Sequence, residues 1–133
     1  MADDASNPDN IEETFVYTGE EGQVVPQDVV RCRVHPSVTI LPDGVFYGRI
    51  KLEDVELSEG LLEIGACAFT ECSALRRISI PSTVAVIRGS ALNNCCELEK
   101  VELCEGLQVI ESYAFVECKS LKHIAIPSTC YSD

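Results

Sequence analysis

Cysteine is the residue type in this chain best suited to chemistry, and three of the eight cysteines recur at a fixed spacing. Cys72, Cys95 and Cys118 stand 23 residues apart. Recurrent thiols can form disulfides, bind zinc or carry redox chemistry. A structural zinc site needs a closely spaced cysteine pair together with a second pair of ligands. Four residues separate Cys67 from Cys72 and Cys96 is adjacent to Cys95, so the spacing is a weak match to zinc.

Other catalytic signatures are missing from the sequence. His35 and His123 lie far apart, and each is more typical of a solvated surface histidine than of a catalyst. The chain contains no G-x-S-x-G, G-x-G-x-x-G, G-x-x-x-x-G-K-[ST] or H-E-x-x-H motif. The sequence therefore predicts no enzyme, no metal and no cofactor.

A 23-residue period organises the chain and positions the cysteines. Moving forward from the block at residues 55–77 returns the same apolar skeleton twice. A period held over three copies, with apolar residues in the same columns, indicates a tandem repeat. Its columns include Val55, Ile78, Val101 and Ile124; Leu61, Val84, Leu107 and Cys130; Ala68-Phe69, Ala91-Leu92 and Ala114-Phe115; and Leu75, Leu98 and Leu121.

Each repeat combines two periodicities. V-x-L and I-x-I alternate with period two, which favours a short strand, and the turn that follows uses Glu59-Gly60 or Ser82-Thr83. The spacing in A-F-x-x-C-x-x-L predicts a helical turn or short helix. We therefore expect an α/β repeat, a solenoid of about 4.5 coils with parallel strands on one side and short helical turns on the other. The repeats run over 32–54, 55–77, 78–100 and 101–123, with a fragment at 124–133.

The segment from Cys67 to Ile87, C-A-F-x-x-C-x-x-L-x-x-I-x-I-P-S-T-V-x-x-I, resembles the BspA-type leucine-rich repeat. The match covers roughly residues 30–133 in repeat length, I-P-S-T, E-G-L and A-F-x-x-C. It departs from the pattern at Leu92 (usually Phe), Arg49 (Cys) and Cys130 (an apolar residue). The resemblance implies a leucine-rich-repeat solenoid. It also implies binding to a protein or a surface, because that is the usual function of the family. It brings no catalytic residues with it.

Within such a solenoid the cysteine ladder favours a structural role. Neighbouring coils lie about 4.7–4.9 Å apart, whereas a disulfide needs Cβ atoms about 3.5–4.5 Å apart, so a ladder disulfide would be strained. Buried thiols that act as small hydrophobes, with sulfur as a weak partner for the turn backbone, are the favoured interpretation. A disulfide, or a metal or redox role, remains the alternative. Cys96 and Cys104 lie off the inward columns and are the expected exposed thiols.

The ends of the chain differ from its middle. Residues 1–10 are acidic and small and predict a disordered tail. Two β-type runs around a Gly-containing loop in 11–28 predict a hairpin that caps the first coil. Residues 29–133 form the expected solenoid, whose last repeat is incomplete.

The charge of the chain limits its partners. The formal net charge is −12, and residues 1–28 carry eight acids and no Lys or Arg. Nucleic acid and anionic membranes are disfavoured because no basic patch stands out. No apolar run is long enough to span a membrane, and no signal peptide is visible, which favours a cytoplasmic location.

The outward positions of the predicted strands form the candidate binding face. Opposite charges in neighbouring coils could instead pair across the strands as Arg31–Asp54–Arg77 and Arg33–Glu56, each pair contributing about 0.2–1 kcal/mol. We favour such ion pairs, because the face lacks the Trp and Tyr that anchor interfaces. Two rows make up the face: Arg31, Asp54, Arg77, Lys100 and His123, and Arg33, Glu56, Ser79 and Glu102.

Two functional hypotheses follow from this architecture. The first is a non-enzymatic protein–protein interaction module that binds another protein through its strand face. The second is a structural fragment of a longer repeat array, or a cell-surface adhesin-type repeat, with no ligand of its own. Self-association through the uncapped C-terminal coil would accompany the second hypothesis.

Overall fold

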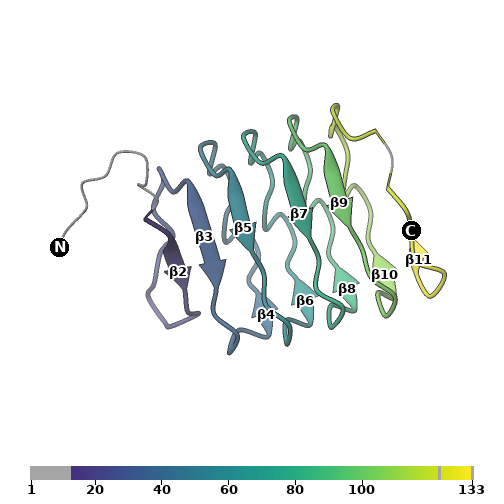
Figure 1. Cartoon of the computed structure of the whole chain (residues 1–133), viewed down its shortest axis with the longest axis horizontal. Helices are drawn as coiled ribbons and strands as arrows, with labels where there is room; N and C mark the ends of the chain where they lie inside the picture. Colours follow the sequence, from purple (N-terminus) through teal and green to yellow (C-terminus); the bar gives the residue numbers. More distant parts are fainter. Residues whose placement is uncertain (1–12, 123, 133) are drawn as a thin grey trace.

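A computed structural model describes residues 13–122 and 124–132, which form a parallel β-solenoid (Figure 1). Its strands are two to four residues long. In chain order they are β2 (Phe15–Tyr17), β3 (Arg31–Val34), β4 (Ile40–Leu41), β5 (Asp54–Glu56), β6 (Glu63–Ile64), β7 (Arg77–Ser79), β8 (Val86–Ile87), β9 (Lys100–Glu102), β10 (Val109–Ile110) and β11 (Tyr131–Ser132).

The strands form two parallel ladders on different sides of the coil. One side, here called the strand face, carries β2-β3-β5 and then β7-β9, and the other carries β4-β6-β8-β10-β11 (Figure 1). The register follows the sequence period, because Arg31 pairs with Asp54 and Arg77 with Lys100. The coils linked in this way make about three turns of about 23 residues, fewer than the 4.5 expected. Residues 13–30 and 124–132 do not complete turns with a strand on both sides.

The expected α/β character and helical turns are wrong, because none of the described residues forms a helix. In the A-F-x-x-C segment Cys67 has φ 57° and Glu71 has φ 63°. Ser90 and Asn94 repeat this left-handed conformation one coil later. A right-handed helix cannot run through two such positions four residues apart. The spacing of three and four that predicted a helix arises from successive tight turns instead.

Main-chain hydrogen bonds show what these turns achieve. The N–H groups of Cys67 and Phe69 donate to Gly89 and Ala91 of the next coil, at 3.1 and 2.7 Å, while Ala68 N–H closes a turn within its own coil at 3.2 Å. A helix would use every donor internally and leave neighbouring coils unlinked. The alternating pattern makes this segment a third ladder between coils.

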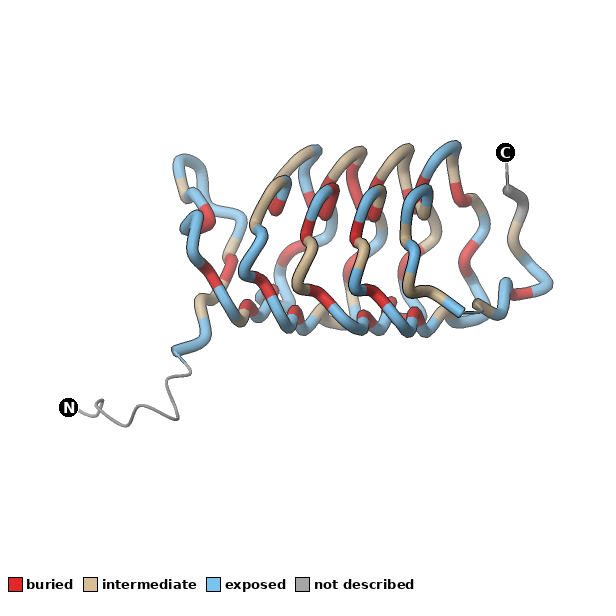
Figure 2. The backbone as a smooth tube through the Cα atoms, turned by 90° about the horizontal axis from the view of Figure 1, so that it is seen from above, coloured by how far each residue is buried: buried red, intermediate tan, exposed pale blue. Residues whose placement is uncertain are grey.

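The interior is a continuous apolar column built from one side chain per coil in each position (Figure 2). The rings of Phe46 and Phe69 stack with centroids 5.0 Å apart, and both are fully buried. Leu92 takes the equivalent place in the next coil and is also fully buried, whereas Phe115 is only partly buried. Burial is therefore complete only where a coil has neighbours on both sides, as expected of a solenoid.

The hairpin expected near the N-terminus is wrong. Strand β2 pairs in parallel with β3, and Val24 and Val25 form no strand. The Gln23 side chain accepts from Thr18 N–H at 2.8 Å and donates to the carbonyl of Val16 at 3.1 Å. These side-chain bonds hold the loop so that β2 extends the strand face by one strand. The tail at 1–10 lies outside the described residues, and the predicted domain boundaries stay predictions.

Arg49 departs from the cysteine column and fastens the N-terminal segment to the first coil. Its guanidinium donates to the carbonyls of Val25 and Tyr47, at 2.7 and 3.0 Å, and to the side-chain oxygen of Gln27 at 3.3 Å. Below this coil lies a loop rather than another coil, so a long side chain with several donors replaces a thiol.

We expect Phe69→Ala to lower the free energy of unfolding by roughly 3–5 kcal/mol, because it opens a cavity in a fully buried ring stack. Phe115→Ala is the matched control and should cause a smaller loss, since Phe115 is only partly buried. Urea unfolding followed by circular dichroism measures both variants. Equal losses would contradict the burial gradient along the column.

Candidate functional site

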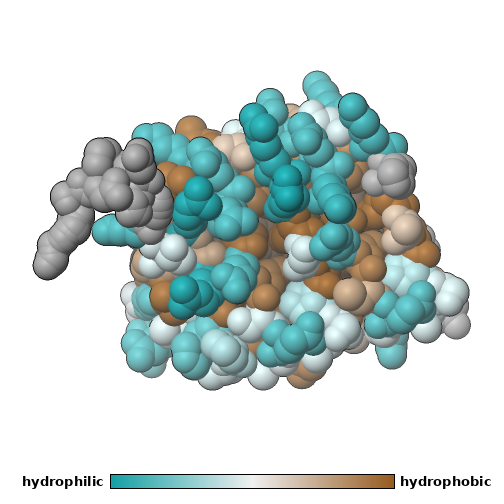
Figure 3. Space-filling model, in the orientation of Figure 1, coloured by the Kyte–Doolittle hydropathy of each residue, from teal (hydrophilic) through white to brown (hydrophobic). Residues whose placement is uncertain are grey.

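The strand face collects most of the polar residues proposed as a binding face, and Figure 3 shows hydrophilic side chains there with hydrophobic surface between them. Two of the expected ion pairs are present. Arg31 lies 3.7 Å from Asp54 and Arg33 lies 3.8 Å from Glu56, between side chains that are all at least 43% exposed. Ion pairs this exposed contribute about 0–1 kcal/mol each.

A second polar group lies on β7 and β9. Ser79 donates a short hydrogen bond to the Glu102 carboxylate, and Lys100 Nζ lies 3.4 Å from the same residue. The Ser79 hydroxyl, followed by the Lys100 ammonium, lowers the pKa of the Glu102 carboxyl. His123, the last residue of the predicted face, lies outside the described residues.

The strand face is interrupted between β5 and β7. The two strands lie side by side, yet they belong to separate hydrogen-bonded sheets (Figure 1). Within the described part of the chain Arg77 forms no ion pair, so the expected continuation from Asp54 to Arg77 is absent. The interruption therefore divides the predicted rows into two clusters.

The residues that follow the strands offer a physical reason for the interruption. Ser58 donates its hydroxyl to the carbonyl of Val34 at 2.7 Å, which ties its coil to the preceding one. Cys104 lies in the equivalent position and donates to Ile80 at 3.5 Å. In the coil between these two, the equivalent residue is Pro81, which has neither an N–H nor a side-chain donor. The coil that contains β7 therefore lacks the tie to β5.

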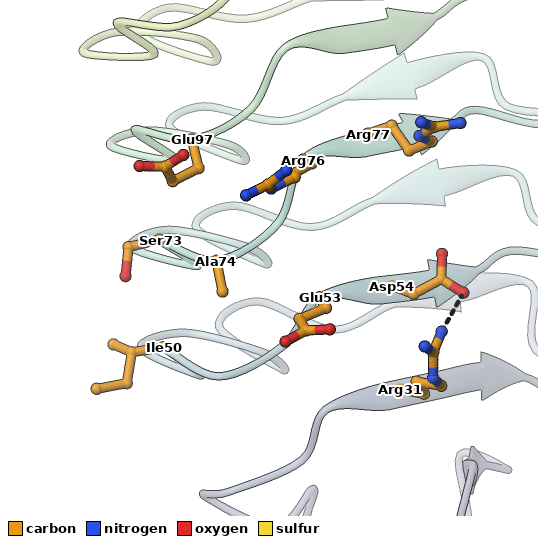
Figure 4. Close-up of a pocket in the computed structure, with 9 residues that line it drawn as sticks. All are labelled: Arg31, Ile50, Glu53, Asp54, Ser73, Ala74, Arg76, Arg77 and Glu97. Carbon is orange, nitrogen blue, oxygen red and sulfur yellow. Dashed lines mark ion pairs between the residues drawn. The ribbon is translucent and has the colours of Figure 1, made fainter. Parts of the chain in front are cut away.

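Two neighbouring recesses lie along this interruption. The smaller, of about 260 Å³, is lined by residues of β5 and β7 together with Leu57. The larger, of about 750 Å³, opens at the starts of the same strands, and both share Asp54 and Arg77. Figure 4 shows the larger recess, whose lining residues are Arg31, Ile50, Glu53, Asp54, Ser73, Ala74, Arg76, Arg77 and Glu97.

Sequence reasoning missed part of this site. Arg76, Glu53 and Glu97 were not among the predicted residues, because they precede the strands or lie in turns. The one available signal was the column that holds Ser58, Pro81 and Cys104, in which a proline replaces a side-chain donor.

The opposite ladder carries a different polar cluster, which the sequence did not reveal. Arg88 lies between two carboxylates of neighbouring coils, with Nε 2.8 Å from Glu63 and Nη1 2.9 Å from Glu111. The hydrogen bond with Glu63, followed by that with Glu111, raises the pKa of the Arg88 guanidinium. This cluster links three coils and leaves no charge of Arg88 for a ligand.

The cysteine ladder has the predicted structural role. The thiols of Cys72 and Cys95 donate to the carbonyls of Phe46 and Phe69 in the preceding coil, at 3.2 and 3.1 Å. Both are free and fully buried. Burial raises the pKa of the Cys72 thiol to about 12 and raises that of Cys95 as well. Cys104 is exposed, as predicted, but the same prediction is wrong for Cys96, which is half-buried.

The described part of the chain contains no group of three or more His, Cys, Asp or Glu residues that could hold a metal ion. Across the same residues, no helix has the length and apolar character needed to cross a bilayer.

We expect Cys104 to react with a thiol reagent in the native protein, and Cys72 and Cys95 to react only after unfolding. Because burial raises their pKa above the ordinary value of 9.0, the buried thiols stay protonated while unfolded thiols ionise. Their contribution to stability is complete below pH 9 and is lost as pH rises towards 12. Labelling with 5,5′-dithiobis(2-nitrobenzoate), followed by peptide mass mapping, measures the order. Rapid native labelling of Cys72 would contradict it, and Cys104→Ser is the control that removes the fast reaction.

Comparison with known proteins agrees with this architecture. The family model described as BspA type leucine-rich repeat region matches residues 31–132 in six copies. A crystal structure of a leucine-rich repeat protein from Bacteroides ovatus ATCC 8483 superimposes with a TM-score of 0.78 at 24% sequence identity. The alignment covers 88% of this chain and 32% of that protein, so the chain spans about a third of its length. Comparison with curated proteins finds no match.

The family model covers most of the described residues. The solved structure shares the fold. The chain therefore belongs to the BspA type leucine-rich repeat family.

Proposed function

We propose that this protein is a non-enzymatic interaction module that binds another protein through its strand face. The observation that carries the proposal is the interrupted strand face, where two recesses open between exposed charged side chains. A regular parallel sheet would satisfy its own main chain and present a flatter surface. A hollowed, charged face on a rigid scaffold is suited to recognising another surface.

The chemistry of the recesses supports binding rather than catalysis. Their lining residues include no cysteine and no histidine. The thiols of the interior column are held protonated by burial and donate to main-chain carbonyls. The recesses therefore present charged and main-chain groups, which favour recognition.

A photo-crosslinker tests where a partner binds. We expect benzoylphenylalanine in place of Glu56, which is exposed on the strand face, to crosslink a protein in an extract of the source organism. The same group in place of Gln108, exposed beside β10 on the opposite ladder, should not. Equal crosslinking from both positions would refute the assignment of the strand face.

An affinity assay with the same extract gives a second test. The double substitution Arg33→Glu and Glu56→Arg should weaken capture of the partner protein, while the net charge of the chain stays the same. Both residues are exposed, so the melting temperature should stay nearly constant.

The second candidate function is structural, as one segment of a longer repeat array. It is supported by the burial gradient towards β11, where Phe115, Leu121 and Ile124 are only partly buried. The earlier members of their columns, Phe69, Leu75 and Ile78, are at most 2% exposed. The structural relative from Bacteroides ovatus continues well beyond the aligned region, since 32% of it is covered.

Sedimentation equilibrium in reductant distinguishes the two candidates. If the structural function holds, the chain should self-associate with increasing concentration, and an appended coil with a polar outer surface should make it monomeric. A monomer at all concentrations would contradict association through this end and leave the interaction module as the proposal. Association that disappears only on reduction would instead implicate exposed thiols such as Cys104.

A further inference from the structure

We propose that the gap between β5 and β7 binds an extended segment of a partner protein that presents a single carboxylate side chain to Arg76 and Arg77. This inference rests on the proposed function and makes it specific in position and in chemistry. It follows from the main chain, the charges and the shape of the two recesses.

The main chain at the gap has unused hydrogen-bonding capacity. Peptide groups along a strand point alternately to its two neighbours. Those of β5 that face β7 belong to Val55, and those of β7 that face β5 belong to Arg77 and Ser79; no hydrogen bond joins the two strands. Because β5 and β7 lie side by side, an extended peptide can supply donors and acceptors to such groups only by moving the two strands apart. Three strand residues on each side correspond to a segment of about three or four residues.

Two arginines at the gap form no direct ion pair with the described residues, and the charge of Arg77 acts only at longer range on the Glu102 carboxyl, whose pKa it helps to lower. Arg31, Arg33 and Lys100 on the same face each form an ion pair. In the described part of the chain, Arg76 and Arg77 form none, although the chain has 22 acidic residues and 10 basic ones. Like charges directly opposite each other on neighbouring strands are unfavourable.

Arg77 stands in that unfavourable position, directly across from Lys100 in the β7–β9 register. Figure 4 shows Arg76 extending over the larger recess and Arg77 on β7 at its other end. A carboxylate bound in the recess could accept hydrogen bonds from either guanidinium.

The other lining residues limit the kind of anion that fits. Glu53 and Glu97 line the same recess, and neither forms an ion pair there. They would repel a ligand with several adjacent negative charges, such as a nucleic acid or an acidic run. Ile50 and Ala74 supply apolar contact area instead. The recess therefore suits one Asp or Glu within an otherwise uncharged segment.

Nuclear magnetic resonance of the ¹⁵N-labelled full chain tests this inference. The probe is the blocked peptide acetyl-Thr-Val-Glu-Val-Thr-amide, compared with the same peptide carrying Gln in place of Glu. We expect the Glu peptide to shift the amide signals of residues 53–57 and 76–79, and the Gln peptide to bind at least about tenfold more weakly.

Matched variants test the role of the arginine. Arg77→Gln should weaken binding of the Glu peptide about tenfold. Lys122→Gln removes the same charge from an exposed cation that forms no ion pair with the described residues, and it should leave binding unchanged. Equal binding of the two peptides, or equal effects of the two variants, would overturn carboxylate recognition.

The site of the shifts separates this inference from the proposed function. Shifts confined to the region of Arg33 and Glu56 would overturn the gap as the site while leaving the strand face as the binding surface. Absence of any shift at millimolar peptide would also overturn the gap, whereas the crosslinking comparison decides the strand face independently.

Discussion

The hydrogen bonding of each coil to the next is the constraint on which the rest of this structure depends. Because the strands are only two to four residues long, no strand is stable alone. Each coil is hydrogen-bonded through its main chain to its neighbours along three lines, the two ladders and the turn segment that contains Phe69. The interior can close only if every coil has the same length. The 23-residue period is the consequence.

Side chains that depart from their column show where this constraint changes. Arg49 replaces a cysteine where the layer below is a loop, and its donors reach main-chain and side-chain oxygens that a thiol could not. Pro81 stands at the position where Ser58 and Cys104, in other coils, donate a side-chain hydrogen bond to the preceding coil. The proline cannot make this bond. The first substitution fastens the N-terminal segment to the first coil, and the second accompanies an opening on the strand face.

The opening matters for function because it interrupts the main-chain pairing in the middle of the strand face. The apolar columns and the buried thiols are fully occupied with packing and main-chain contacts. Arg88 is likewise occupied, by carboxylates of two neighbouring coils. What remains for a partner is the outward surface, and within it the gap combines main-chain groups with arginines that form no direct ion pair with the described residues. Recognition of another chain is a natural use for such a surface.

Much of the architecture was determined by the sequence alone. The period, the inward columns and the cysteine ladder could all be read from residue types, since a repeated coil places equivalent residues in equivalent surroundings. The cross-strand pairs Arg31–Asp54 and Arg33–Glu56 followed from the same register. Only the tertiary structure decided that the A-F-x-x-C segment forms turns, because backbone angles such as the φ of Cys67 depend on the hydrogen bonds available in the next coil. It also decided that β2 runs parallel to β3 and that Arg77 is separated from Asp54. These features depend on contacts between coils, which a local pattern of residue types does not specify.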